Sequence, residues 1–305
     1  MAERLVADGV VCLGAAVLDT IFRVEAIPTT PTKVLPADCV QLGQGMASAA
    51  AAAVAKLGGR ARIWARIGDD AAGRQYLEDM QAAGVDVSQV RRVAGRRTAI
   101  STILVDRAGQ CLVVPYYDPA LDPDPSWLQL DAVATFGAAM VDTRWPDGAD
   151  ALLRAARAAG RHAVLDADIA PVEVLARLVP LATHALFSQA ALALFSGSGD
   201  IGTGLRMAAE RTTGLVGTTA GERGFYWLDG GAIRHVPAPQ VDAVDTLAAG
   251  DVFHGAFALL LAEGRPTDEA ARFACAAASL KCTRFGGRLG APARAEVEAM
   301  LARKS

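Results

Sequence analysis

The residues best suited to chemistry are concentrated in the segment DTLAAGDVFHGAF, residues 245–257. Its small side chains directly precede a predicted helix that begins near Ala249, so a ligand can approach the backbone there. The first turn of a helix has unpaired N–H groups and the positive end of the helix dipole, so the amides of Ala248, Ala249 and Gly250 can hold a developing negative charge. Asp251 lies in the same turn, where it can act as general base for a hydroxyl that attacks phosphorus. An acid that only stabilises a helix N-terminus gives the same pattern, so spacing alone leaves both roles open.

Two other nucleotide-binding motifs are excluded by their context. The run GQGMAS, residues 43–48, opens a predicted helix, and Asp69 follows roughly 20 residues later, which imitates a dinucleotide-binding fingerprint. In that fold the glycine turn directly follows the first buried strand, whereas here a long segment separates it from Gly14. The sequence G-x-x-x-x-G-K-[ST] does not occur, so a P-loop mechanism is also excluded.

The chain around this signature alternates between strand and helix patterns. Such alternation is typical of an α/β protein, in which a parallel sheet has helices on both faces. The predicted strands are 10–14, 62–67, 138–142, 162–166, 184–188 and 213–217, and the helices between them are 47–57, 72–83, 147–159, 171–178 and 190–195. A hairpin of strands 224–228 and 232–236 follows, and then helices at about 249–263, 267–284 and from 292.

Two strand-rich segments interrupt this alternation. Residues 21–42 and 96–119 alternate between polar and apolar side chains and contain several prolines, which predicts a small second sheet. Asp19 precedes the first of these segments, and we expect it at the end of the first central strand and its loop.

Composition narrows the possible functions. The 305 residues carry 30 Lys and Arg against 33 Asp and Glu, a net charge of −3, so no nucleic-acid partner is expected. No apolar run reaches the roughly 18 to 20 residues of a membrane span, and the N-terminal MAERLVADGVV lacks the pattern of a signal peptide. Five scattered cysteines and four histidines share no metal-ligand spacing, which favours reduced thiols and a cytoplasmic location.

The segment DTLAAGDVFHGAF closely resembles the C-terminal signature of the ribokinase-like (PfkB) sugar kinases, D-T-x-[GA]-A-G-D. The resemblance extends to GQGMASAAAAAVAKLGG, ARIGDDAAGRQYLEDMQAAGVDV and GTTAGERG. It implies a three-layer αβα core with a mostly parallel sheet, formed by residues 1–20, 43–95 and 120–305, and a small β-sheet lid formed by 21–42 and 96–119. It also implies that ATP with Mg²⁺ is the phosphoryl donor, that Asp251 is the general base, and that the amides of residues 248–250 form the anion hole.

Within the family the chain is most similar to sulfofructose kinases, through PTTPTKVL, DTRWPDGA, VLDADIAP and SLKCTRFGGRLG. This resemblance implies a small keto-sugar or anionic sugar as acceptor. Asp19 and Gly45 would bind the sugar, and Lys33 and Arg144 would face an anionic group on it. A solvated loop lysine and a structural ion pair are the alternative roles of these two cations. The family resemblance also implies ATP contacts at Thr218, Gly221 and Gly224.

The chain departs from the family pattern at several positions. The usual Gly-Gly pair becomes Gln44-Gly45, an Asn of the sugar site becomes Ala49, and Pro115 replaces an Asn expected in a sulfosugar kinase. The N-x-x-E motif that helps to organise Mg²⁺ reads SQAA at residues 188–191. Asp166 and Asp168 are then the candidate metal ligands, since Mg²⁺ is often held by one or two carboxylates together with substrate phosphates.

Two alternatives to the sugar kinase remain open from the sequence. The lost N-x-x-E acid and the altered glycine pair would suit a catalytically weak sugar-binding or regulatory protein. A nucleoside kinase would share the fold, but a neutral nucleoside gives no role to Lys33 and Arg144. Exposed edges of lid strands often pair between protomers, so a homodimer formed through the lid is expected by resemblance.

Overall fold

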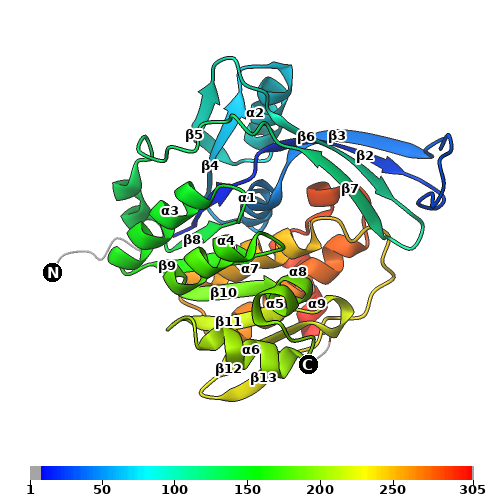
Figure 1. The fold of residues 1–305 in the computed structure, drawn as a ribbon. Coiled ribbons are helices and arrows are strands. Elements are labelled where there is room, and N and C mark those ends of the chain that lie inside the picture. The colour runs from blue at the N-terminus through cyan, green and yellow to red at the C-terminus, as the bar shows by residue number, and fades with distance from the viewer. Residues whose placement is uncertain (1–7, 304–305) are drawn as a thin grey trace.

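A nine-stranded sheet forms the centre of the computed structural model, which describes residues 8–303 (Figure 1). Its strands are β1 (Val10–Gly14), β4 (Ala61–Gly68), β5 (Asp86–Val93), β8 (Ala138–Val141), β9 (His162–Ala167), β10 (His184–Ser188), β11 (Leu215–Thr219), β12 (Phe225–Asp229) and β13 (Ala232–Val236). Their order is β13-β12-β11-β10-β9-β8-β1-β4-β5. Every pairing from β11 to β5 is parallel, and β12 is antiparallel to both of its neighbours.

Helices cover both faces of this sheet, as the alternation of strand and helix patterns predicted (Figure 1). One face packs against α1 (Met46–Lys56), α2 (Ala71–Ala82), α7 (Ala249–Ala262), α8 (Thr267–Cys282) and α9 (Arg294–Ala302). The other face packs against α3 (Pro146–Ala158), α4 (Val172–Leu178), α5 (Gln189–Ser196) and α6 (Ile201–Ala209). Short 3₁₀ turns lie at Leu130–Thr135, Val179–Leu181, Gly221–Arg223 and Gly287–Gly290.

The central strands β1 and β8 are apolar along their whole length because each face meets a helical layer. In β1, Val10 and Cys12 belong to one hydrophobic core, while Val11 and Leu13 belong to the other. All four side chains are 0% exposed. The sequence VVCLG therefore has no polar alternation, and its length and β-branched residues identify it as a buried strand.

Small residues bring helix α1 against helix α7. The alanines of α1 from Ala49 to Ala51 are fully buried, and a Cβ added at Gly255 of α7 would lie 2.5 Å from the carbonyl oxygen of Ala50. The two helices therefore pack backbone to backbone. This contact fixes the N-terminus of α7, which carries the signature, relative to the loop that precedes α1.

A separate four-stranded sheet projects from the core (Figure 1). It consists of β2 (Val17–Arg23), β3 (Asp38–Gln44), β6 (Ala99–Val105) and β7 (Cys111–Tyr116), in the order β3-β2-β6-β7. We call this sheet the lid. The predicted second sheet is thus present, but β2 begins at Val17, so Asp19 lies inside a lid strand and not at the end of a central strand. The polar–apolar alternation in VLDTIFR marks this earlier start.

The other differences from the predicted elements are local. Helix α6 was not predicted, because its sequence IGTGLRMAA contains two glycines; the side chain of Asp200 caps it by accepting a hydrogen bond from Thr203 N. Strand β11 ends two residues later than predicted. Residues 1–7, at the start of the N-terminal segment for which no signal peptide was predicted, lie outside the described residues. Among residues 8–303, no helix has both the length and the apolar character needed to cross a membrane.

Candidate active site

The signature forms the loop before α7 and the first turn of that helix. Ala248 is the N-cap and has φ 62°, and it is the one non-glycine residue with positive φ among residues 8–303. This left-handed conformation is strained for a residue with a Cβ, and such strain is typical of functional sites. The amide of Ala249 donates to the carbonyl of Thr246 at 3.2 Å, so the predicted anion hole is incomplete there. Within the described chain, the amides of Ala248 and Gly250 have no such acceptor and remain available to an anion.

The first turn of α7 separates two chemically different regions. On one side, Ala249 and Gly250 line a cavity. On the other side, Asp251 faces a group of carboxylates. Burial raises the pKa of Asp251 well above its ordinary value, and the negative charge of Asp168 is the next largest cause. Asp142 and Asp19 raise the pKa further, whereas the ammonium of Lys281 lowers it. This environment favours the protonated carboxyl, so the predicted general base readily takes up a proton.

Asp166 is the second buried carboxylate of this group, at the carboxyl end of β9. Burial raises its pKa well above the ordinary value, and the charges of Asp251 and Asp168 add to this effect. His254 lies beside it, with Nδ1 3.5 Å from the Asp166 carboxylate and 2.8 Å from the carbonyl of Gly250. Burial lowers the pKa of His254, so the imidazole is neutral and, with its proton on Nδ1, donates to Gly250. His254 thus holds the first turn of α7.

Asp142 was not singled out from the sequence, yet it joins three segments. It follows β8 and is 0% exposed. Its carboxylate accepts hydrogen bonds from the amides of Ala15 (2.8 Å), Ala47 (3.0 Å) and Arg144 (2.8 Å). The loop after β1, the start of α1 and the start of the segment after β8 are therefore held at one point. The position directly after a buried strand, in MVDTR, is the signal that could have identified it.

The sugar-binding residues proposed by resemblance lie where the lid joins the core. Asp19 is 5% exposed, and its carboxylate accepts hydrogen bonds from Ser101 Oγ (2.6 Å) and Gln44 Nε2 (2.9 Å). Gly45 is the N-cap of α1 with φ 109°, and a Cβ there would lie 2.5 Å from the carbonyl oxygen of Ala15. Gly45 is therefore required by its backbone conformation and by the close approach of the loop.

The departures from the family pattern have structural explanations. Gln44 is 3% exposed, and its Oε1 accepts a hydrogen bond from the amide of Arg288 at 2.8 Å. Its amide group therefore bridges Asp19 and the segment after α8. Pro115 lies on the edge strand β7, opposite Ser101 of β6, and an edge strand tolerates the missing N–H of proline. Ala49 is buried in α1.

Arg144 lies at the carboxyl end of β8, close to the carboxylate group. One of its nitrogens lies 3.6 Å from Asp168, and another donates to the carbonyl of Ile169 at 2.9 Å. The hydroxyl of Tyr117, just after β7, also contacts Arg144, and burial raises the pKa of Tyr117 to about 12. The ion pair considered for Arg144 from the sequence is thus present. Tyr117 is a site residue that sequence reasoning missed.

Lys33 is not brought together with Arg144 in this chain. It is exposed in the segment that links β2 to β3, residues 24–37. Figure 1 shows this segment at the tip of the lid, away from the carboxyl ends of β8 and β9. The predicted pair of cations is therefore separated.

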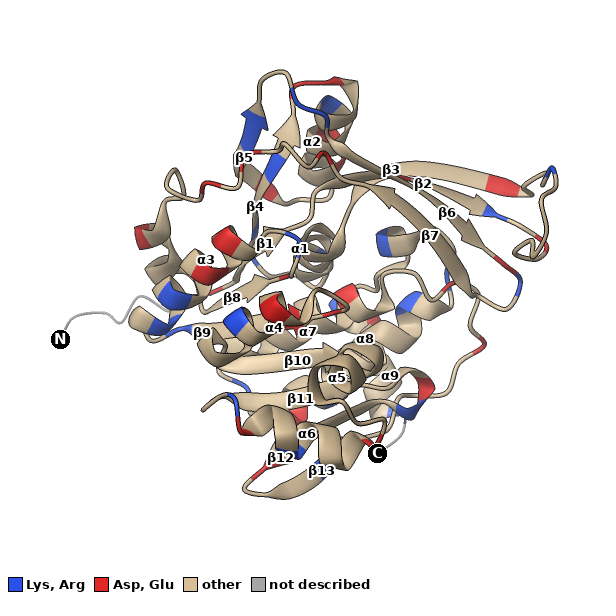
Figure 2. Cartoon of the chain, viewed as in Figure 1, with Lys and Arg blue, Asp and Glu red and all other residues tan. Residues whose placement is uncertain are grey.

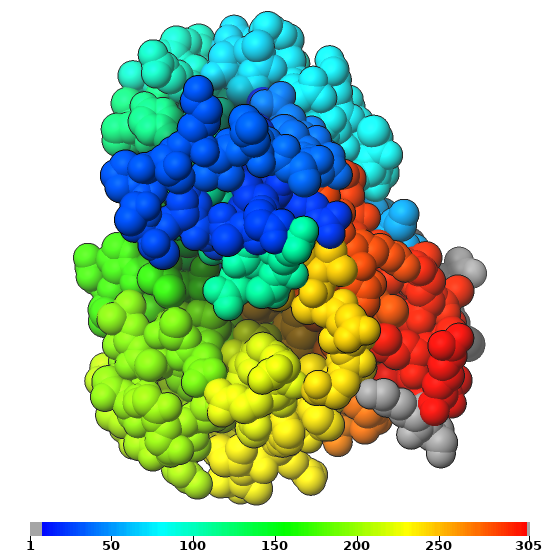
Figure 3. All heavy atoms as spheres, turned by 90° about the vertical axis from the view of Figure 1, so that its right-hand side faces the viewer, coloured from blue at the N-terminus to red at the C-terminus, as the bar shows by residue number. Residues whose placement is uncertain are grey.

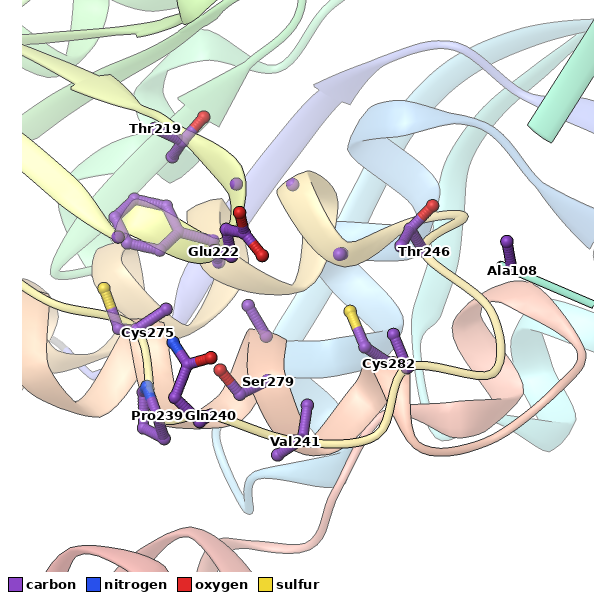
Figure 4. A pocket seen from close by; sticks show the side chains of 18 residues that line it. Ala108, Thr219, Glu222, Pro239, Gln240, Val241, Thr246, Cys275, Ser279 and Cys282 are labelled. Carbon is purple, nitrogen blue, oxygen red and sulfur yellow. The ribbon is translucent and has the colours of Figure 1, made fainter. Parts of the chain in front are cut away.

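The cavity beside α7 has a volume of about 530 Å³, within the usual range for a small-molecule site (Figure 4). Its walls come from the loop after β11, the segment 238–250 and the face of α8. The lining residues are Ala108, Thr219, Gly221, Glu222, Gly224, Ala238, Pro239, Gln240, Val241, Ala243, Thr246, Ala249, Gly250, Phe253, Cys275, Ala278, Ser279 and Cys282.

Of the three predicted nucleotide contacts, Gly221 and Gly224 line this cavity and Thr218 does not. Thr218 is 0% exposed, and Thr219 lines the cavity instead. Successive side chains of a strand point to opposite faces, so only one of these neighbouring threonines faces the cavity. The α8 residues Ser279 and Cys282 had no local signal in the sequence.

The lid also reaches this cavity through the turn between β6 and β7. Ala108 lines the cavity, and Thr246 Oγ donates to the carbonyl of Gly109 at 2.6 Å. The amide of Thr246 donates to the same carbonyl at 3.2 Å. Figure 3 shows this turn, in teal, resting against the yellow-to-orange segment that precedes α7, above a hollow in the surface.

The residues that could hold a metal ion are few. Among residues 8–303, no group of three His, Cys, Asp or Glu side chains could hold one by itself. Residues 188–191, which stand where the family has N-x-x-E, have a structural role here. Ser188 caps α5, because its hydroxyl accepts a hydrogen bond from the amide of Ala191 at 3.2 Å. The charges of neighbouring carboxylates raise the pKa values of Asp166 and Asp251, and a divalent cation would relieve this repulsion; Asp166 and Asp168 are the residues that would hold it, together with nucleotide phosphates.

Comparison with known proteins agrees with this architecture. Residues 7–294 match the family model described as pfkB family carbohydrate kinase, so the chain belongs to this family. It is 32% identical to a fructokinase of Klebsiella pneumoniae over 254 residues, which make up 76% of this chain and 81% of that protein. It is 25% identical to the ribokinase of Bacillus subtilis over 292 residues, or 95% and 98% of the two chains. The protein is thus an ATP-dependent carbohydrate kinase by class.

Solved structures confirm the fold. A protein of Agrobacterium tumefaciens, provisionally described as a ribokinase, superposes with a TM-score of 0.94 and 44% identity, covering 98% of this chain and 99% of that chain. The ribokinase of Arabidopsis thaliana, solved with ribose and ATP, gives a TM-score of 0.83 at 23% identity, covering 97% and 99%. The family and the three-layer core with a separate small sheet, both predicted from the signature, are confirmed.

Proposed function

We propose that this kinase transfers the γ-phosphoryl group of ATP to a primary hydroxyl of a small keto-sugar or anionic sugar such as sulfofructose. The observation that carries the proposal is the position of the N-terminus of α7. It lies between the cavity of about 530 Å³ and the set of neighbouring carboxylates that includes Asp251. Donor and acceptor can therefore approach the same helix turn from opposite sides. We place ATP in the cavity, against Thr219, Gly221 and Gly224.

The chain's own residues account for the proton and the developing charge. The Asp251 carboxylate accepts the proton of the acceptor hydroxyl as its oxygen approaches the γ-phosphorus, and the bond to the ADP oxygen breaks. The amides of Ala248 and Gly250 donate to the phosphoryl oxygens, aided by the dipole of α7. Asp166 and Asp168 are the residues that would hold a nucleotide-bound Mg²⁺, which would neutralise charge on the phosphates. His254 keeps the turn in place through the carbonyl of Gly250.

The acceptor region combines an acid with a cation. Asp19 presents a buried carboxylate that can accept sugar hydroxyls, and Arg144 presents a partly exposed guanidinium; the charges of both act on Tyr117. A guanidinium binds a sulfonate, carboxylate or phosphate through two parallel hydrogen bonds, so Arg144 supports an anionic acceptor. Tyr117 adds a hydroxyl beside Arg144. Lys33 can contribute to this site only if the lid tip moves or a second protomer brings it there.

We also propose a homodimer formed through the lid, in the cytoplasm. The strands β6 and β7 carry no charged residue, and Figure 2 shows both in tan. Ile100, Leu112, Val114 and Tyr116 lie on one face of this sheet, with 42% to 61% of each side chain exposed. A second copy of the same lid is apolar in the same way and would cover this face.

The first experiment measures ADP release with Mg·ATP across a panel of acceptors, with Asp251→Asn as the blank. The panel contains sulfofructose, fructose, a fructose phosphate, tagatose, a 2-keto-3-deoxy acid, ribose and adenosine. We expect an anionic keto-sugar to react fastest and Asp251→Asn to lower turnover by about two orders of magnitude or more. Preference for adenosine would favour the nucleoside kinase. Turnover no higher than the blank with every acceptor would favour a sugar-binding protein.

A further inference from the structure

A buried lysine contacts the loop that leads to the proposed anion hole. Lys281 is near the end of α8 and is 0% exposed. Its ammonium donates to the carbonyl oxygen of Asp245 at 2.6 Å and lies 3.1 Å from the Asp245 carboxylate, which is also 0% exposed. Removing two charges from water costs more than a simple ion pair usually returns, so such a pair is weak evidence for stability alone. The phosphoryl-transfer mechanism above does not use it.

The Asp245 carboxylate joins the catalytic loop to the segment after α8. One of its oxygens accepts a hydrogen bond from the amide of Leu247 at 2.8 Å. The other accepts from the amides of Gly286 and Gly287, both at 2.9 Å. Ala248, the strained N-cap of α7, follows Leu247 directly. Through these hydrogen bonds, Asp245 holds both the residue before Ala248 and the turn at Gly286 and Gly287.

We propose that Lys281 is a positioning residue for phosphoryl transfer. Its ammonium fixes the carbonyl and carboxylate of Asp245, so that the amides of Ala248 and Gly250 are aimed at the phosphoryl group before the substrates bind. The inference rests on the proposed function, in which these amides form the anion hole. The preorganisation of such donors makes a large contribution to catalysis, because no binding energy is then spent on ordering them.

The first test compares Lys281→Met with Lys56→Met, which removes an exposed lysine from α1. Methionine keeps the length of the side chain and removes its charge. We expect Lys281→Met to lower kcat by about tenfold to a hundredfold with a much smaller change in the KM of the sugar, and Lys56→Met to leave both unchanged. A kcat equal to that of the wild type would overturn the proposal.

A double variant separates positioning from folding. Lys281→Met alone leaves the Asp245 carboxylate buried without its partner, which destabilises the fold. Asp245→Asn combined with Lys281→Met removes that charge and keeps an amide oxygen as acceptor for the glycine amides. We expect thermal stability to recover in the double variant while kcat stays low. Recovery of kcat together with stability would show a purely structural role.

Hydrogen–deuterium exchange tests the same proposal without turnover. Amides of residues 244–251 should exchange at least about tenfold faster in Lys281→Met than in the wild type, while Lys56→Met should match the wild type. Equal exchange in this segment would contradict the positioning role. If the wild type phosphorylates no acceptor, the proposed function fails, and this exchange comparison still decides whether Lys281 orders the loop.

Discussion

At the scale of single residues, the candidate site contains buried acids whose environment favours the protonated, neutral form. Burial raises the pKa values of Asp251 and Asp166, and the negative charge of Asp168 raises both further. An ionised carboxylate in such a place lowers the stability of the ligand-free protein, and the same environment makes it a better base. The proposed catalytic role of Asp251 and the stability of the fold are therefore opposed.

This opposition predicts how Asp251→Asn affects stability. Because the folded pKa of Asp251 lies above the unfolded value, the folded protein binds the proton more tightly, and stability falls as pH rises through the interval between the two values. Asparagine removes this loss. We expect the melting temperature of Asp251→Asn to exceed that of the wild type at pH 8, by on the order of a few degrees, and to approach it near pH 4.

The matched control is Asp242→Asn, since Asp242 is exposed. Thermal melts of the three proteins across this pH range provide the measurement. A variant that is less stable than the wild type at pH 8 would show that Asp251 is stabilised by contacts that outweigh its burial.

At the scale of elements, the β6–β7 turn of the lid is attached to the loop before α7. Thr246 contributes both its amide and its hydroxyl to the carbonyl of Gly109. Thr246→Val keeps the shape of the side chain and removes the hydroxyl donor. We expect it to raise the KM for ATP several-fold, by the equivalent of a net hydrogen bond of about 1 kcal/mol, because Ala108 then leaves the cavity wall more easily.

Thr213→Val serves as the control, because Thr213 is exposed before β11. Steady-state kinetics with ATP as the varied substrate gives the comparison. If Thr246→Val has the same KM for ATP as the control, the turn does not contribute to the nucleotide site.

The elements also show what a sequence can and cannot predict here. Residues 10–14 and the helix signature at 245–257 are determined by local patterns, so the strand, the helix and Asp251 were predicted. Asp142 escaped prediction because its partner Ala15 is 127 residues away, and a hydrogen bond of that separation leaves no local pattern. The ion pair of Lys281 with Asp245 is long-range in the same way.

At the scale of the whole molecule, the apolar face of the lid predicts self-association. Val114 is 61% exposed at the centre of this face, on β7. Val114→Asp should convert the proposed dimer to a monomer, because a buried unpaired carboxylate strongly opposes association. Sedimentation equilibrium of the wild type and Val114→Asp measures this directly. A wild type that is monomeric at micromolar concentration would contradict the proposed dimer.

Ala108 lies in the wall of the proposed nucleotide cavity, and this position has a consequence for the hydrolysis of ATP by water. Asp19, on β2, and the β6–β7 turn belong to one hydrogen-bonded sheet, so a tilt of the lid moves the proposed acceptor contact and the cavity wall together. A water molecule is too small to make the contacts with which a sugar would stabilise a closed position of the lid. We therefore expect little idle hydrolysis of ATP when sugar is absent, and synergy between the two substrates when both are present.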